Sequence, residues 1–364
     1  MISPSKSRIW RKRSRTLPVV AGALLSVVLA ACSSSSSTNN ASTNSKASST
    51  TVTLAMGANY GVGNLSPLYY GVKQGYWSSQ GVNMQVKAGT GSATVVDQVS
   101  AGQYDFAFLD TSVAAGLIAK GAGVKVIAEM QNKSDIGIYC NSTYNITAAK
   151  ALVGKTLSSS PGDSINYLIP AFTKNAGIQL SSVQVRDMAI PLKLTSVTDG
   201  QSDCATGYTS YAPTQVAYGT DQKMTATTVS FSNYGVDVVG YGLIGNDKFM
   251  QAHPQTTEAV VAGFIKSMYE GFLNPQASNA AGEAANPTAP SASFLAQLKA
   301  WVKSGLEPYW VSGEQLGAND PAAWKTTLNF LHSYEGVTNM DPSAYYTNQY
   351  IPKDAPVLPL TIPY

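Results

Sequence analysis

Two stretches of the chain carry hydroxyl side chains in the same sequence pattern. Residues 99–121 and 197–219 align without a gap and share the pattern GQxDxAxxxTSxA. In both, a Thr-Ser pair follows a short apolar segment, where its hydroxyl groups could cap a helix or bind a ligand. A carboxylate precedes the first pair and could accept a hydrogen bond from a ligand N–H or ammonium group. A phenol ring precedes the second and could stack on a ligand ring. The candidate ligand contacts in these stretches are Asp110, Thr111, Ser112, Tyr208, Thr209 and Tyr211.

Polar turns supply the remaining candidates. The segment 58–64 offers amide donors and a ring, although its glycines could serve the turn alone. The small residues of the turn 89–92 would let a ligand approach the backbone closely, with helix capping as the alternative. This turn lacks the Lys-Ser/Thr of a Walker motif, which excludes nucleotide hydrolysis. Asp163 is expected to cap a helix. The candidate contacts in these turns and at two later strand ends are Asn59, Tyr60, Asn64, Thr90, Ser92, Ser160 and Asp187.

Alternating strands and helices must position these residues. Strands are expected at 52–56, 82–87, 105–109, 124–130, 155–159, 183–188, 203–207 and 226–231, with helices beginning near residues 66, 91, 111 and 164. This alternation predicts an α/β fold with mainly parallel sheets covered by helices on both faces. The repeated pattern predicts two lobes of similar topology. Ligands of such sheets bind beyond the carboxyl ends of the strands, so the candidate residues would face one cleft.

Composition excludes several functional classes. The chain has 364 residues, of which 44% are hydrophobic and 12% charged, which is enough for a sizeable core and more than one domain. Removing the six basic residues before residue 16 from the 24 basic residues leaves 18, against 21 acidic residues, a net charge of −3. Arg186 is the only arginine beyond that segment, so no basic stripe could follow nucleic acid. The three cysteines form no CxxC and no Cys/His cluster, so we expect no metal site and no cofactor.

The N-terminal segment has the pattern of a bacterial export signal. Basic residues precede an apolar run at 17–31, which ends in Leu29-Ala30-Ala31-Cys32, a sequence similar to a lipobox. We therefore expect a signal peptide at residues 1–31 and lipidation of Cys32, which would anchor an extracytoplasmic protein to the bacterial cell membrane. The alternative is an uncleaved anchor in which Cys32 is incidental. Residues 32–50 are mostly Ser, Thr, Asn and Ala and are expected to form a flexible tether.

The order of several motifs resembles the substrate-binding proteins of ABC importers for nitrate, sulfonates, taurine and thiamine-pyrimidine precursors. The segment 69–77 (YYGVKQGYW), followed by Gly81-Val82, is similar to the opening motif of that family. Segments 101–105, 120–127, 152–156 and 346–350 resemble later motifs in the same order, and the resemblance spans about residues 52–352.

The resemblance implies a two-lobe, type II periplasmic-binding-protein-like fold. Its crossovers would lie near 134–140 and 234–240, with residues 51–134 and 238–364 in the first lobe and 138–234 in the second. Ligand closes such lobes, and the permease and ATPase subunits of the importer are the implied partners of a monomer. The topology of the family would also bring Cys140 beside Cys204. We hypothesise a disulfide between them, with two buried free thiols as the alternative.

Three functions follow from these observations. The first is a solute-binding lipoprotein for transport, whose ligand would be a thiamine-type pyrimidine or related heteroaromatic, or alternatively taurine, an alkanesulfonate or nitrate. The second is an enzyme, since a pyrimidine synthase shares the fold, but the sequence has only two histidines and no recognisable catalytic group. The third is a surface protein without a transport role. We expect binding rather than catalysis.

Overall fold

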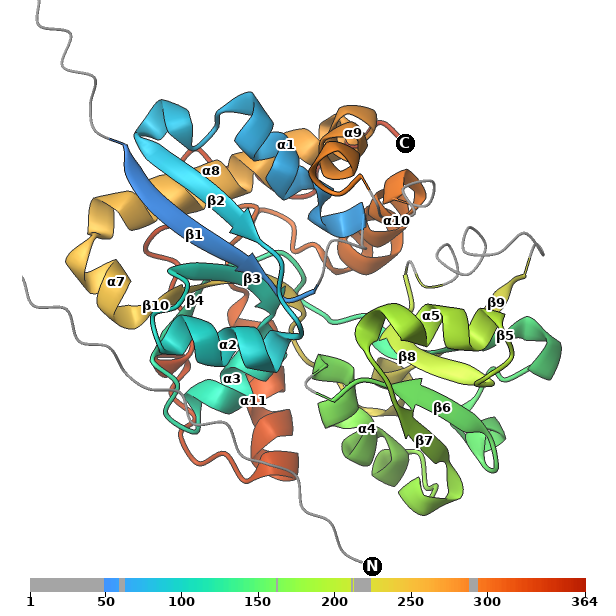
Figure 1. Cartoon of the computed structure of the whole chain (residues 1–364). Helices are drawn as coiled ribbons and strands as arrows, with labels where there is room; N and C mark the ends of the chain where they lie inside the picture. Colours follow the sequence, from blue (N-terminus) through green and yellow to red (C-terminus); the bar gives the residue numbers. More distant parts are fainter. Residues whose placement is uncertain (1–48, 59–62, 162, 211, 213–223, 288–293) are drawn as a thin grey trace, which may run out of the picture. The chain divides into compact units, whose positions relative to one another are not determined.

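The computed structural model describes residues 49–58, 63–161, 163–210, 212, 224–287 and 294–364. Within these ranges the strands form two five-stranded sheets (Figure 1). The first sheet has the order β2-β1-β3-β10-β4, and the second has the order β7-β6-β8-β5-β9. One strand in each sheet, β10 or β5, runs antiparallel to both of its neighbours. The expected mainly parallel α/β architecture with two lobes is confirmed.

The strand bounds agree closely with the expected segments. The first sheet contains β1 (Thr50–Met56), β2 (Val82–Lys87), β3 (Phe106–Asp110), β4 (Val124–Glu129) and β10 (Tyr241–Asn246). The second contains β5 (Ile136–Asn141), β6 (Thr156–Ser159), β7 (Gln184–Asp187), β8 (Cys204–Tyr208) and β9 (Ala226–Ser230). Two strands, β5 and β10, have no counterpart among the strands expected from residue pattern. Glycines interrupt the apolar run of β10. A Cβ at Gly242 would lie 2.6 Å from Ala128 O, so close packing against β4 requires glycine there.

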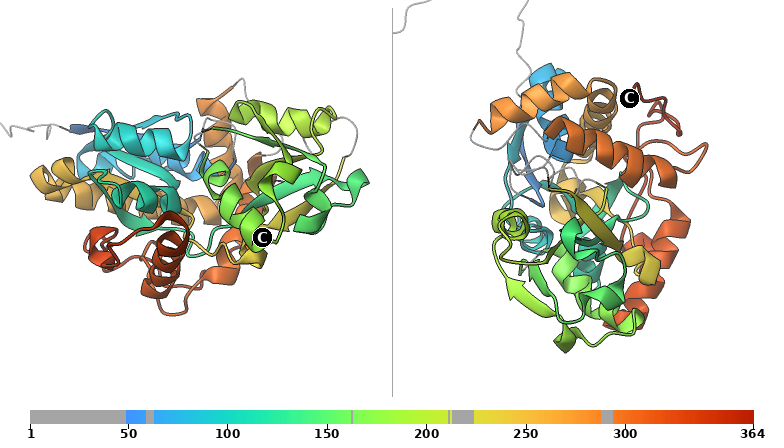
Figure 2. Two further views of the ribbon diagram at one scale, coloured as in Figure 1. Left: turned by 90° about the horizontal axis from the view of Figure 1, so that it is seen from below. Right: turned by 90° about the vertical axis from the view of Figure 1, so that its right-hand side faces the viewer.

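Helices cover both faces of each sheet. Alternate residues of β1 show this, since Val52 and Leu54 pack in the same core as α8, whereas Ala55 packs with α2. Helix α8 is the long helix drawn in gold and orange along the first sheet (Figure 2). In the second sheet, α4 packs with Cys140 and Leu157 on one face and α5 packs with Tyr139 on the other. The helices are α1 (Ser66–Gln74), α2 (Ser92–Ser100), α3 (Thr111–Ile118), α4 (Ser164–Asn175), α5 (Ile190–Thr198), α7 (Asp247–Ala252), α8 (Pro254–Leu273), α9 (Pro275–Ala285), α10 (Phe294–Ala300), followed by a π-helix at Trp301–Leu306, and α11 (Pro321–Glu335).

The sequence repeat corresponds to a repeated hydrogen-bonding unit. Asp105, before β3, accepts hydrogen bonds from the backbone N–H and the hydroxyl of Thr53, both at 2.8 Å. Asp203, before β8, accepts the same two bonds from Thr156 at 2.8 and 2.9 Å. Each carboxylate therefore ties its own strand to the neighbouring parallel strand, which explains why the aspartate recurs in both halves of the pattern.

We expect Asp105→Ala and Asp203→Ala to destabilise the protein by similar amounts, about 2 kcal/mol each, because each leaves two donors without their charged acceptor. Urea unfolding of both variants would measure the two free energies. Loss of stability in only one variant would contradict the equivalence of the two units.

Two crossover segments, 130–135 and 231–240, connect the sheets and bond to each other. Ser134 N donates to Val238 O at 2.7 Å, and Gly240 N donates to Gln131 O at 2.8 Å. Lys133 and Asp237 add an ion pair at 2.7 Å. The first crossover was expected at 134–140, but residues 136–140 belong to β5, so it lies earlier in the chain. The paired backbone makes the crossovers a two-stranded hinge.

Cys140 and Cys204 lie directly opposite each other in the antiparallel pair of β5 and β8 and are joined by a disulfide. Both residues are fully buried beneath α4. Within the described ranges, every helix is too short or too polar to cross a bilayer.

Candidate functional site

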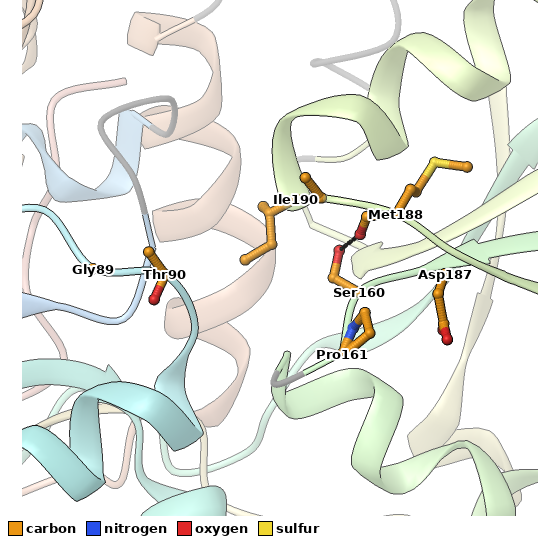
Figure 3. A pocket seen from close by; sticks show the side chains of 8 residues that line it. Gly89, Thr90, Ser160, Pro161, Asp187, Met188 and Ile190 are labelled. Carbon is orange, nitrogen blue, oxygen red and sulfur yellow. Dashed lines mark hydrogen bonds between the residues drawn. The ribbon is translucent and has the colours of Figure 1, made fainter. Parts of the chain in front are cut away.

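A pocket of about 510 Å³ lies at the carboxyl ends of strands from both sheets (Figure 3). The turn after β2 forms one wall, and the turns after β6 and β7 form the other. The lining residues are Gly89, Thr90, Ser160, Pro161, Asp187, Met188, Ala189 and Ile190. Three candidates from the sequence, Thr90, Ser160 and Asp187, are thus brought together from segments far apart in the chain.

The walls of this pocket are shaped by tight turns and helix ends. The Ser160 hydroxyl donates to Met188 O at 2.7 Å, which joins the turns after β6 and β7 (Figure 3). A Cβ at Gly89 would lie 1.9 Å from Met56 O, so only glycine fits this turn. Helices α2 and α5 begin at the pocket, after Gly91 and Ala189, without a side-chain cap. The first N–H groups of α2 are therefore available to a ligand acceptor. In α5, Pro191 has no N–H, and Leu192 N donates to Ala189 O at 2.9 Å.

Asp110 lies behind the first wall rather than in it. It caps α3, where Oδ1 accepts from Ser112 N at 3.1 Å and from Ser112 Oγ at 2.5 Å. Its own N–H donates to Ser92 Oγ at 3.3 Å, which links it to the turn that carries Thr90. The side chain is 0% exposed, and Oδ2 has no hydrogen-bond partner among the described residues. Burial raises the pKa of Asp110 to about 7, with a smaller contribution from the charges of Asp163 and Asp135.

The threonine of each Thr-Ser pair forms hydrogen bonds with a crossover segment. The N–H and hydroxyl of Thr111 donate to Gly240 O at 2.6 and 2.9 Å, and those of Thr209 donate to Asp135 O at 2.7 and 2.9 Å. The acceptors immediately precede β10 and β5, so the two contacts are equivalent. Neither threonine lines the pocket. Their hydroxyl groups are already used in joining the strand ends to the hinge.

The carboxylates that bind the two serines come from different places in the two lobes. Ser112 binds Asp110 at the end of its own strand, whereas the N–H and hydroxyl of Ser210 bind Asp135 in the first crossover. Tyr208 occupies the position equivalent to Asp110, and Gly240 occupies the position equivalent to Asp135. Sequence reasoning missed Asp135 because it lies in a connecting segment with no recognisable motif.

Gln131 and Glu129 continue this network through the hinge. The Gln131 side chain donates to Asp135 Oδ1 at 2.6 Å, and its N–H donates to Glu129 Oε1 at 3.2 Å. The Thr111 hydroxyl lies 2.5 Å from Glu129 Oε2 and 2.9 Å from Gly240 O, although it has one proton for two acceptors. A protonated Glu129 supplies the missing donor, in agreement with burial, which raises its pKa well above the ordinary value.

Aromatic rings meet beside the hinge. Tyr208 contacts Tyr241 at 5.2 Å between ring centroids, and Tyr241 contacts Trp301 at 6.1 Å. Tyr241 lies opposite Asp110 in the pairing of β10 with β3. Tyr208 is thus part of an aromatic cluster whose other members the sequence analysis did not identify.

A buried ion pair stands behind the second wall. Asp163 caps α4, as expected, by accepting from Ile165 N, and it also pairs with Lys193 of α5. Lys193 donates further to Thr206 Oγ1 at 3.1 Å and is 6% exposed. The sequence analysis did not identify this pair, although a single lysine in the mainly apolar segment 190–197 could have indicated it. Among the described residues, no three Asp, Glu, His or Cys side chains are grouped as metal ligands.

The other candidates do not line the pocket or lie outside the described residues. Asn64 is buried near α10, and both polar atoms of its side chain are without a hydrogen-bond partner in the described ranges. Ser92 is buried and accepts from Asp110 N. The candidates outside the described residues are Asn59, Tyr60, Tyr211 and the lipidation site Cys32.

Comparison with protein families matches residues 63–278 to the family described as NMT1/THI5-like. The match covers more than half of the 364 residues. This chain belongs to the NMT1/THI5-like family. No curated protein matches its sequence.

Solved structures similar to this NMT1/THI5-like chain share its fold at low sequence identity. The alkanesulfonate-binding protein SsuA from Xanthomonas axonopodis pv. citri, bound to MOPS, is 12% identical with a TM-score of 0.61, over 81% of this chain and 98% of that protein. The periplasmic nitrate-binding protein NrtA from Synechocystis PCC 6803 is 13% identical with a TM-score of 0.56, over 81% and 84%. A DszB mutant in complex with biphenyl-2-sulfinic acid is 12% identical with a TM-score of 0.54, over 82% and 97%.

Proposed function

We propose that this NMT1/THI5-like protein is the extracytoplasmic substrate-binding component of an ABC importer. The observation that carries this proposal is a pocket formed by strand ends of two sheets whose connecting segments pair as a hinge. The two lobes also touch where Tyr167 and Asn175 of α4 bond to Glu335 and Tyr334 of α11. Such an arrangement lets a ligand favour the closed state by touching both walls, and a permease can distinguish closed from open protein. The similar proteins, the alkanesulfonate-binding protein SsuA and the periplasmic nitrate-binding protein NrtA, support a binding role outside the cytoplasm.

The proposed ligand is a small polar molecule, with a thiamine-type pyrimidine or related heteroaromatic ahead of a sulfonate or nitrate. A volume of about 510 Å³ suits one small ring with its substituents. Thr90 and the uncapped start of α2 would bind ring acceptors, and Ile190 and Met188 offer apolar contacts. Thr111 and Thr209 are proposed to hold the hinge instead of the ligand.

Binding rather than catalysis also fits the positions of the two histidines. His253 follows α7, with its ring 4.7 Å from that of Phe249, and His332 Nδ1 lies 2.7 Å from Val337 O. Neither histidine lines the pocket. We further propose that the protein is a monomer and that it is anchored to the membrane through lipidated Cys32. The lipobox-like sequence supports the anchor alone.

A ligand screen with a blocked-pocket variant tests the proposed function. Thr90→Trp would fill the pocket, whereas Thr326→Trp places the same ring on an exposed position of α11 as the control. We expect pyrimidines or related compounds to raise the Tm of the wild type and of the control, following RT ln(1 + [L]/Kd), and to leave Thr90→Trp unchanged. A Tm increase that persists in Thr90→Trp would place binding elsewhere.

A further inference from the structure

Carboxylates of the protein itself accept hydrogen bonds from backbone N–H groups near the cleft. Asp110 accepts from Ser112 N at the start of α3, Asp163 accepts from Ile165 N at the start of α4, and Asp135 accepts from Ser210 N just after β8. Helix-start N–H groups are the usual means by which an uncharged cleft binds an anion. A ligand anion at the start of α3 or α4 would have to displace a resident carboxylate, whereas α2 begins at the pocket without a side-chain cap.

Carboxylates also stand immediately behind both walls of the pocket. Asp110 bonds to Ser92, two residues after Thr90 in the first wall, and Asp163 follows Pro161 in the second wall by two residues. Asp187 lines the pocket itself. The charges of Asp163 and Asp135 both raise the pKa of Asp110. Carboxylates of both sheets therefore lie in the pocket lining or directly behind it, and Asp163 among them is paired with Lys193.

Two of the three basic residues close to the pocket lining in sequence already bond to other groups of the protein. Lys193 pairs with Asp163 and Thr206. The Arg186 guanidinium donates to Gln201 O, on the opposite side of β7 from the side chain of Asp187. Lys87, at the end of β2, is the remaining basic residue close to the lining in sequence. Among the described residues, no cation forms an ion pair with Asp110 or Asp135.

Asp110 provides the strongest sign of a missing positive partner. A buried carboxylate normally has its acceptor sites filled or a counter-charge nearby, because an unpaired buried charge is costly. Oδ1 of Asp110 has two donors, but Oδ2 has none within the described ranges. The aromatic pair Tyr208 and Tyr241 lies beside it, and ring faces also favour cations.

We infer that the ligand of this pocket is an organic cation, which balances the carboxylates behind the two walls. This inference rests on the proposed function and names the chemical class of its ligand. It separates this chain from the similar SsuA and NrtA proteins, whose named ligands are sulfonates and nitrate.

A screen in three charge classes tests the inference on the full-length protein. The cations are thiamine and 1-methylnicotinamide, the neutral compounds are 4-aminopyrimidine and nicotinamide, and the anions are methanesulfonate, nicotinate and nitrate. Tm shifts find the binders and calorimetry measures their Kd. Two variants that each remove one charge are compared, Asp110→Asn and Lys87→Gln. Asparagine retains the cap of α3, and circular dichroism verifies that both variants are folded.

At pH 8, above the pKa of about 7 of Asp110, we expect the cations to bind most tightly. Their Kd should be raised at least about tenfold by Asp110→Asn and unchanged by Lys87→Gln, because removing one charge near the pocket weakens attraction by that order. Tighter binding of an anion, lost in Lys87→Gln, would overturn the inference and leave the proposed function standing. A neutral compound that binds the wild type and Asp110→Asn with equal Kd would also overturn the inference and leave the proposed function standing. If no compound of any class raises the Tm, the proposed binding function itself is contradicted.

Discussion

A Cys140→Ala/Cys204→Ala double variant is expected to lose about 4 kcal/mol of unfolding free energy relative to the wild type. The disulfide closes a loop with a sequence separation of 64 residues, which restricts the unfolded chain. That loop contains β6, β7 and the helices between them, so the crosslink stabilises most of the second sheet. Both sulfur atoms are also buried, and their removal costs packing in the core beneath α4.

Urea unfolding in the presence and absence of dithiothreitol measures this effect. Reduction should destabilise the wild type by a similar amount and leave the double variant unchanged, which separates the crosslink from the packing lost on substitution. Titration of the unreduced, unfolded protein should find neither Cys140 nor Cys204 as a free thiol. Two free thiols, or a wild type insensitive to reduction, would contradict the disulfide.

An Asp110→Asn variant is expected to be more stable than the wild type at pH 8, by about 4 kcal/mol, and equally stable at pH 4. Burial raises the pKa of Asp110 from 3.8 to about 7 in the folded protein. Between these values the folded protein keeps a proton that the unfolded chain releases, so stability falls as the pH rises from about 4 to about 7. Asparagine retains the cap of α3 but carries no charge, which removes this pH-dependent cost.

The measurement is the free energy of unfolding of both proteins, without ligand, at pH values from 4 to 8. The difference between them should grow with pH, whereas effects of the substitution on packing would be the same at every pH. Burial also raises the pKa of Glu129 and Asp135. The charge of Asp110 adds to the rise in the pKa of Glu129, so the measured difference includes this coupling. A difference that does not vary with pH would show that Asp110 is ionised at all these pH values.

Strand and helix positions could be predicted because they depend on local signals. Val82–Lys87 has the expected bounds, and α1 and α4 begin at the expected residues 66 and 164. The repeated aspartate was also visible in the sequence, although its role in joining parallel strands was not. Strand β10 escaped prediction because its glycines are explained by neighbours such as Ala128, which are distant in sequence.

The candidate site could be predicted only in part. Strand ends and turns are local features, so Thr90, Ser160 and Asp187 were identified, and the structure brings them to one pocket. The two threonines were candidates for the same reason, but their hydroxyl groups bond to crossover carbonyls that no local pattern reveals. Hydrogen-bond partners depend on the pairing of distant segments, which residue spacing does not specify.

The sequence by itself determined the alternation of strands and helices, the duplicated unit and the edge of the sheets at which polar residues gather. These properties follow from hydrophobic pattern, turn residues and chain direction, all of which act over short distances. Only the tertiary structure decided that Asp135 binds the serine of the second lobe as Asp110 binds that of the first. It also decided that no basic side chain in the described part of the chain forms an ion pair with either carboxylate. Charge balance is a property of the folded neighbourhood, because it depends on which groups share the same buried space.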